Sequence, residues 1–265
     1  MGFGWGIFGA SFATVLAQLI AFLLCLRSLR RLPFVQLTKA DWKTDPAILL
    51  HLCRLGIPTG LQMSMITLGG MVLQSVLNGF GVVFVAGYTA ANKLYGILES
   101  ASVAFGYAMT AYMGQNRGAR NAARIDAGIR AVLALSAGFT AAIVTAMLLA
   151  GKPLLGLFLS TEEAGAADAL AVAYQYLMAL MAFLFALFVL QAYRSSLQGL
   201  GEMTVPTLSG FAEMLMRMGA ALVLPTFIGQ SGVFFAEGAA WVCAAALNLV
   251  WYYMRIGKIK RDMLK

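Results

Sequence analysis

Residues 169–193, ALAVAYQYLMALMAFLFALFVLQAY, form a stretch of 25 residues without a charge. A helix of about 20 apolar residues spans the hydrocarbon core of a bilayer. Four more stretches lack charge over comparable lengths: 1–26, 55–92, 131–151 and 218–236. The core of a soluble protein does not use runs of this length, so the sequence predicts an integral membrane protein.

The overall composition leads to the same class. Of the 265 residues, 61% are hydrophobic and 11% are charged, whereas a typical soluble domain has about 45–50% apolar and about 25% charged residues. The mean hydropathy is +0.81. A membrane-spanning β-barrel would show alternating segments of about 10 residues, which this sequence lacks. The sequence therefore predicts an all-α integral membrane protein.

Clusters of Gly, Pro, Asn and charged residues interrupt the apolar stretches and mark the ends of helices. We predict seven transmembrane helices, at about residues 7–29, 48–77, 86–113, 128–151, 169–194, 205–227 and 233–255. The longest polar connection divides the chain. We therefore expect three parts, namely a first helix within residues 1–31, a cytoplasmic linker at 32–47 and a six-helix bundle in residues 48–265.

Basic residues are concentrated in alternate connections between these helices. One set of connections carries 16 of the 19 Lys and Arg residues, including Arg117, Arg194 and Arg255, and the opposite set carries only Lys152. Because short loops rich in Lys and Arg stay on the cytoplasmic side, we expect a cytoplasmic C-terminus and an N-terminus outside. The net charge of +8 thus reflects topology and requires no nucleic-acid partner.

The sequence offers little for metal binding or catalysis. Cys25, Cys53 and Cys243 lie singly in or beside apolar segments, and His51 is the single histidine. Isolated cysteines behave as small buried hydrophobic residues, and metal sites need several ligands at set spacings. We therefore expect no metal site, no cofactor, no catalytic residues and no enzymatic activity.

Five charged residues lie at membrane depth, where each charge is costly and marks a functional candidate. They are Lys93, Glu99, Glu213, Arg217 and Glu237. Glu213 and Arg217 are four residues apart, so they are neighbours on one helix. We interpret them as a structural ion pair that orients the sixth helix, and direct ligand binding is the alternative.

Glu99 differs, because its helix neighbours three and four residues away offer no cation. It lies on a polar stripe whose members are spaced by three or four residues: Tyr88, Asn92, Tyr95, Glu99, Ser102, Gly106 and Thr110. Such a stripe faces a water-filled cavity or the interior of a helix bundle. Lining of a cavity and polar contacts between helices both explain it.

A weak internal repeat divides the chain in a similar way. Residues 6–10, GIFGA, resemble residues 232–236, GVFFA, at an offset of 226 residues. Chance similarity between glycine-started apolar helices explains the match equally well. A true repeat makes the first helix the last one of a preceding unit.

Five ordered motifs resemble those of bacterial multidrug and toxic compound extrusion (MATE) transporters. They are LGIPTGLQ at 55–62, LQSVLNGFG at 73–81, AANK at 90–93, YMGQNRGA at 112–119 followed by Arg124 and Ile125, and RSSLQGLG at 194–201 followed by Glu213 and Arg217. The resemblance covers essentially the whole chain.

The resemblance implies a twelve-helix antiporter in the bacterial inner membrane, driven by Na⁺ or H⁺, that exports cationic or amphipathic drugs and toxic organic compounds by alternating access. This chain would then be the last helix of an N-terminal lobe and the entire C-terminal lobe. Such an incomplete or split transporter needs the missing N-terminal lobe or a second copy. The residues expected to line its substrate cavity are Gln62, Gln74, Asn78, Asn92, Tyr95 and Glu99.

Residues 55–78 lack the carboxylate with which some family members bind the coupling cation in this lobe. We therefore expect the cation site to lie upstream of Met1, with Glu99 as the alternative. A second hypothesis is a lipid-linked precursor flippase of the same superfamily, which would favour a more cationic cavity. A third is a non-transporting membrane fragment. An intramembrane enzyme is a hypothesis of a different class, and it would need paired catalytic groups at membrane depth, such as Ser with His.

Overall fold

The computed structural model describes residues 6–31, 43–159 and 165–264. Within these residues the chain forms seven α-helices, one short 3-10 helix and no strand, which confirms the predicted all-α class. The chain divides into two compact units, Met1–Leu52 and Cys53–Lys265. Among the described residues, the first unit holds the first helix and the start of the second, and the second unit holds the rest.

The helices follow one another without intervening sheet structure. Their bounds are α1 (Gly6–Leu29), α2 (Pro46–Asn78), α3 (Val82–Gly118), α4 (Ala122–Gly156), α5 (Ala166–Gly199), α6 (Thr204–Ile228), η3 (Gln230–Phe234) and α7 (Phe235–Leu264). Six predicted spans fall inside one α-helix each. The seventh predicted span, 233–255, begins in the 3-10 helix η3 and continues into α7.

α3 lacks the long apolar window that the other α-helices contain. Six helical segments are long and apolar enough to cross a membrane by length and composition alone, and α3 is not among them. It nevertheless extends over 37 residues and packs along α5. Its sequence includes the stripe with Asn92 and Glu99, so its low hydropathy follows from polar residues that the second unit partly encloses.

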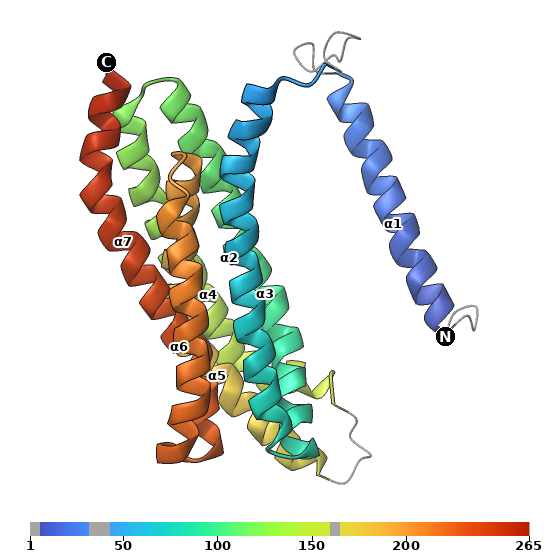
Figure 1. Ribbon diagram of the computed structural model, residues 1–265. Coiled ribbons are helices and arrows are strands. Elements are labelled where there is room, and N and C mark those ends of the chain that lie inside the picture. Colours follow the sequence, from blue (N-terminus) through green and yellow to red (C-terminus); the bar gives the residue numbers. More distant parts are fainter. Residues whose placement is uncertain (1–5, 32–42, 160–164, 265) are drawn as a thin grey trace. The chain divides into compact units, whose positions relative to one another are not determined.

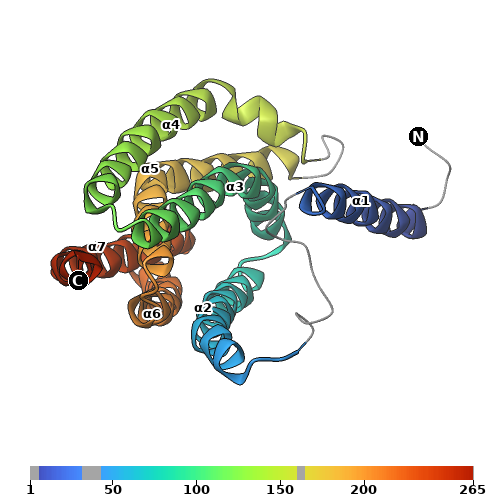
Figure 2. The same cartoon turned by 90° about the horizontal axis from the view of Figure 1, so that it is seen from above.

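α5 is the central helix of the second unit. It packs against α3, α4 and α7 (Figures 1 and 2). Buried side chains lie all around its axis, as they do in a helix surrounded by other elements. At Gly87, α3 approaches α5 so closely that an added Cβ would lie 2.4 Å from the carbonyl oxygen of Ala169. The absence of a side chain at Gly87 therefore permits this packing.

α2 approaches α6 within the second unit. The hydroxyl of Thr207 on α6 donates a hydrogen bond of 3.2 Å to the main-chain carbonyl of Pro58 on α2. Three residues further along α6, a Cβ on Gly210 would lie 2.7 Å from Cγ of Gln62. The two helices therefore meet where α6 lacks a side chain, and a direct hydrogen bond to the α2 backbone reinforces the contact.

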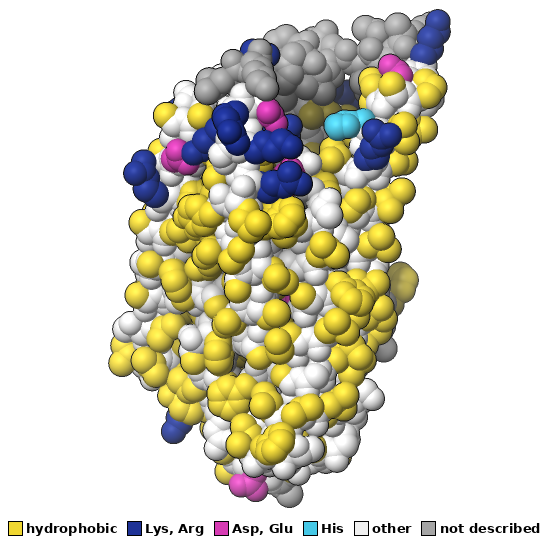
Figure 3. All heavy atoms as spheres, turned by 60° about the vertical axis from the view of Figure 1, so that its left-hand side comes forward, with side chains coloured by type: hydrophobic (Ala, Val, Ile, Leu, Met, Phe, Trp, Pro, Cys, Tyr) yellow, Lys and Arg dark blue, Asp and Glu magenta, His cyan; other side chains and the backbone are white. Residues whose placement is uncertain are grey.

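Basic side chains gather at one end of the second unit (Figure 3). The α3–α4 and α5–α6 connections and the C-terminal end of α7 lie at this end (Figure 1). Its basic residues include Arg117, Arg120, Arg124, Arg130, Arg255, Lys258, Lys260 and Arg261. Between the two ends the surface exposes apolar side chains such as Leu135, Leu149 and Leu222. An apolar belt between polar ends suits a bundle that crosses a bilayer.

Candidate functional site

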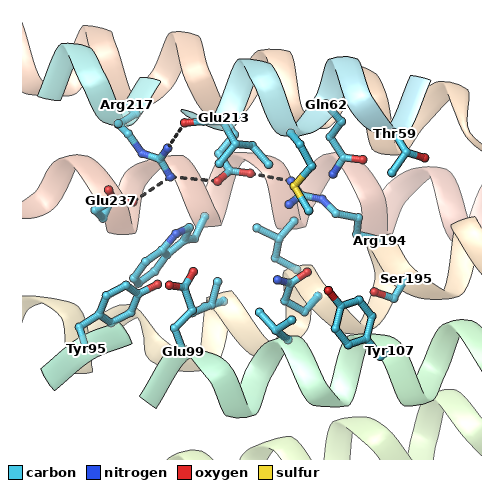
Figure 4. A pocket seen from close by; sticks show the side chains of 18 of the residues that line it. Thr59, Gln62, Tyr95, Glu99, Tyr107, Arg194, Ser195, Glu213, Arg217 and Glu237 are labelled. Atoms are coloured by element: carbon cyan, nitrogen blue, oxygen red, sulfur yellow. Dashed lines mark hydrogen bonds and ion pairs between the residues drawn. The ribbon is translucent and has the colours of Figure 1, made fainter. Parts of the chain in front are cut away.

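A cavity of about 540 Å³ lies between α2 and α3 in the second unit. Side chains from α5, α6 and α7 form its remaining walls (Figure 4). Five helices therefore contribute to one site, although the sequence separates its first and last lining residues, Thr59 and Trp241, by most of the chain.

Four charged residues form a continuous network along one wall. Glu213 on α6 bridges two arginines, since its Oε2 lies 2.6 Å from Nη2 of Arg194 and its Oε1 lies 3.0 Å from Nη2 of Arg217. The same Nη2 of Arg217 lies 2.8 Å from Oε2 of Glu237 on α7. Two guanidinium groups and two carboxylates cancel in formal charge, and their contacts offset part of the cost of burying them.

The structure forms the contact expected between Glu213 and Arg217, but the spacing along one helix does not predict their partners, Arg194 and Glu237. The predicted fifth helix ends at Arg194, whereas α5 continues to Gly199 and leaves Arg194 only 6% exposed. The sequence nevertheless holds a signal for the position of Arg194. Because α5 and α6 form a hairpin, residues equally far from the turn lie opposite each other. Arg194 and Ser209 are such a pair, and Nη2 of Arg194 lies 3.4 Å from Oγ of Ser209.

Glu99 lies across the cavity from this network (Figure 4). Its side chain is half-buried, and it forms no ion pair with any residue that the structure describes. The hydroxyl of Tyr95 points toward it. Three carboxylates and two guanidinium groups line the cavity. With all five ionised, the cavity carries one formal negative charge, and Glu99 is its source.

The structure places five of the six expected cavity residues around this cavity. They are Gln62, Gln74, Asn92, Tyr95 and Glu99. Asn78 lies one turn beyond the lining, where its Oδ1 accepts a hydrogen bond of 3.1 Å from Nε2 of Gln74. On the opposite wall, Nε2 of Gln198 donates a hydrogen bond of 3.0 Å to Oε1 of Gln62, which fixes the orientation of one amide in the cavity.

The polar stripe of α3 has two roles. Its members Tyr88, Asn92, Tyr95, Glu99 and Thr110 line the cavity. Ser102 is fully buried and donates a hydrogen bond of 2.9 Å to the main-chain carbonyl of Glu99, and Gly106 lies against Oγ of Ser195 on α5. Both explanations offered for the stripe, cavity lining and contact between helices, thus apply to different residues.

Two stacked aromatic rings line the cavity that also contains Glu99. The rings of Tyr95 and Trp241 stack with their centroids 5.6 Å apart and their planes at 22°. Sequence reasoning missed Trp241 as a lining residue, although it lies four residues after Glu237 on the same face of α7. A carboxylate beside aromatic faces can bind an organic cation by ion pairing and by cation–π contact. Among the described residues, no group of three or more His, Cys, Asp or Glu could hold a metal ion.

One family model and several curated proteins match this chain. The model of the MatE family matches residues 58–223. The probable multidrug resistance proteins YpnP and YoeA of Bacillus subtilis are 32% and 26% identical to this chain, and each match covers 97% of this chain and 56% of the relative. The chain thus spans a little over half the length of these relatives.

Solved structures share the fold. A MOP superfamily transporter from Pyrococcus furiosus Vc1 superimposes with a TM-score of 0.86 at 23% identity, over 97% of this chain and 58% of the transporter. At this identity the match shows a common fold and no more. The shared region again amounts to somewhat more than half of the solved chain.

Proposed function

Because this chain belongs to the MatE family, we propose that it forms the C-terminal lobe of a multidrug exporter, which carries cationic or amphipathic organic compounds across the bacterial inner membrane. Residues 48–265 are this lobe, residues 1–31 hold the last helix of the N-terminal lobe, and residues 32–47 link the two. The curated relatives are named as multidrug resistance proteins, which supports the substrate class.

The observation that carries the proposal is the charge of the cavity. The two arginines are occupied by Glu213 and Glu237, so the surplus charge is the carboxylate of Glu99. Tyr95 and Trp241 line the same cavity with the parts of their stacked rings that remain exposed. A lipophilic cation satisfies both features, because its charge meets the carboxylate and its apolar surface meets the rings.

The same observation argues against a flippase for lipid-linked precursors. Such a substrate carries phosphates, which need free guanidinium or ammonium groups. Arg194 and Arg217 line the cavity, but carboxylates already occupy both. A cavity with a negative surplus would repel the head group.

Transport requires a second lobe, so that the cavity can open alternately to either side. We propose that this lobe comes from residues preceding Met1 or from a second copy of the chain. A Na⁺ ion or a proton drives the exchange if it binds one of the two states more tightly than the other. We place the coupling site in the N-terminal lobe, with Glu99 as the alternative. No cofactor is needed. The basic end of the second unit faces the cytoplasm, following the charge rule for loops.

Reconstitution into liposomes tests the proposal. Efflux of ethidium is followed after imposing a Na⁺ or a H⁺ gradient, with the chain alone and with the chain fused to a MatE N-terminal lobe. We expect gradient-driven efflux from the two-lobe protein and its loss in Glu99→Gln. Asp262→Asn serves as control, because Asp262 is exposed near the end of α7 and should leave efflux unchanged. Efflux that survives in Glu99→Gln contradicts a cation cavity built on this residue.

A further inference from the structure

An apolar groove of about 560 Å³ runs along the outer surface of the second unit, between α3 and α4. It shares no lining residue with the cavity described above. Small exposed residues and the exposed Leu135 form its rims, and larger buried side chains form its floor. Rim residues include Ala104, Ala108, Ala127 and Ala131, and floor residues include Met109 and Val132.

Arg124 stands at one end of this groove. It precedes Ala127, Gly128 and Ala131 by three, four and seven residues, so it lies on the face of α4 that lines the groove. Its main-chain carbonyl accepts a hydrogen bond of 2.9 Å from the hydroxyl of Tyr112. Side chains on a helix lean toward its N-terminus, so the Arg124 guanidinium extends past the groove toward the polar end of the bundle.

Three arginines at this end have no acidic partner among the residues that the structure describes. Arg120, Arg124 and Arg130 are exposed, and none of them forms an ion pair with a described residue. The nearby acidic residue Asp126 is already paired with Lys260. An anion at the mouth of the groove would therefore meet the free guanidinium group of Arg124.

The length of the groove identifies the kind of occupant. On α4 its lining runs from Ala127 to Leu135, a separation of eight residues that corresponds to about 12 Å along the helix axis. The hydrocarbon core of a bilayer is about 30 Å thick, so the groove extends through about one leaflet. A transmembrane helix of another protein would need an apolar seam about twice as long, whereas one acyl chain anchored at the interface fits.

We propose that this groove binds an acyl chain of an anionic phospholipid, with the lipid phosphate held by Arg124. The small rims of α3 and α4 admit a single chain, and the unpaired arginine at the groove mouth selects an anionic head group over a zwitterionic one. Lipid binding in this groove is independent of the transported substrate.

Lipid binding by the purified, delipidated protein tests the inference. Native mass spectrometry and the thermal unfolding midpoint are recorded with dioleoyl phosphatidylglycerol and with dioleoyl phosphatidylcholine. We expect one retained phosphatidylglycerol per chain and a rise of the midpoint by about 3 °C or more, with a weaker effect of phosphatidylcholine. Soluble glycerol 3-phosphate should have no effect, because it lacks the acyl chain.

Matched variants separate the two parts of the site. Ala131→Leu fills the groove and should abolish retention of the lipid, whereas Arg124→Gln should remove the preference for phosphatidylglycerol. Ala137→Leu and Arg130→Gln change exposed residues of α4 outside the groove lining and should behave as the wild type. Equal retention of both lipids by the wild type overturns the proposal. Equal losses of the preference for phosphatidylglycerol in Arg124→Gln and Arg130→Gln also overturn it. If the groove instead binds a second copy of the chain, Ala131→Leu would convert a dimer to a monomer without changing lipid binding, and this result would overturn the proposal as well.

Discussion

The guanidinium of Arg217 on α6 donates a hydrogen bond of 3.0 Å to the main-chain carbonyl of Ile66 on α2. Through its other amino group, Arg217 contacts Glu213 and Glu237. α2 forms one side of the cavity, so a single side chain connects the buried ionic network to a cavity wall. The position of α2 should therefore respond to changes in that network.

Arg217→Lys tests this connection. A lysine keeps the positive charge but presents one ammonium in place of a planar fork, so it cannot serve the carbonyl of Ile66 and both carboxylates with the same geometry. A lost hydrogen bond of about 1 kcal/mol should speed amide hydrogen exchange around residues 66–70 by about 5-fold. Exchange is measured by mass spectrometry, with the exposed Arg130→Lys as control. Unchanged exchange in α2 would show that Arg217 does not hold this wall.

Glu213→Gln should destabilise the protein strongly. Glu213 is 3% exposed and bridges Arg194 and Arg217, so its neutral amide leaves Arg194 without an ionic partner and Arg217 with Glu237 alone. Breaking a buried ion pair costs about 3–5 kcal/mol. The free energy of unfolding in detergent measures this loss. The control Asp262→Asn, at an exposed residue, should change it by less than about 0.5 kcal/mol. Similar values for both variants would mean that Glu213 contributes little to stability.

Glu99→Gln should weaken binding of a lipophilic cation while leaving the fold intact. An ion pair at about 4 Å contributes about 4 kcal/mol at an effective dielectric constant of about 20, so we expect the Kd for tetraphenylphosphonium to rise by about 10-fold or more. Equilibrium binding to the purified protein measures it. A neutral ligand of similar shape should bind the variant as well as the wild type, and a matching loss for that ligand would point to a change in cavity shape instead of charge.

Two glycines of α3 give opposite predictions for the same substitution. A Cβ on Gly87 would lie 2.4 Å from the carbonyl oxygen of Ala169, whereas a Cβ on Gly96 would meet nothing within 4 Å. Gly87→Ala should destabilise the protein by about 1–3 kcal/mol through overpacking. Gly96→Ala should be neutral or stabilising by up to about 1 kcal/mol, because alanine favours the helix. Unfolding of both variants in detergent compares them directly, and equal effects would contradict the close contact of α3 with α5.

Apolar stretches predicted where the helices lie, because lipid imposes one length and one polarity on every span. They could not predict where helices end outside the bilayer, since no such constraint acts there; α5 thus continues five residues past Arg194. Spacing along one helix predicted contacts such as that of Glu213 with Arg217. The contacts of Arg194 and Glu237 with the same network depend on how α5, α6 and α7 pack, which a pattern within one helix does not encode.

The proposed orientation makes a prediction for residues at opposite ends of the bundle. Ala119 caps the end of α3, and Ser231 lies in η3 between α6 and α7. Both are exposed, and the three helices α4, α5 and α6 separate them, so they face opposite sides of a membrane. Single cysteines are placed there after Cys25, Cys53 and Cys243 have been replaced by alanine.

Because loops rich in Arg and Lys stay inside, a membrane-impermeant maleimide should label Ser231→Cys in intact cells. It should label Ala119→Cys only after permeabilisation. Labelling of Ala119→Cys alone in intact cells would show that the orientation is opposite to the proposed one. The free guanidinium groups at the α3–α4 connection would then face the outer leaflet. The charge rule would have failed for this chain, although the geometry of the cavity and the groove would be unaffected.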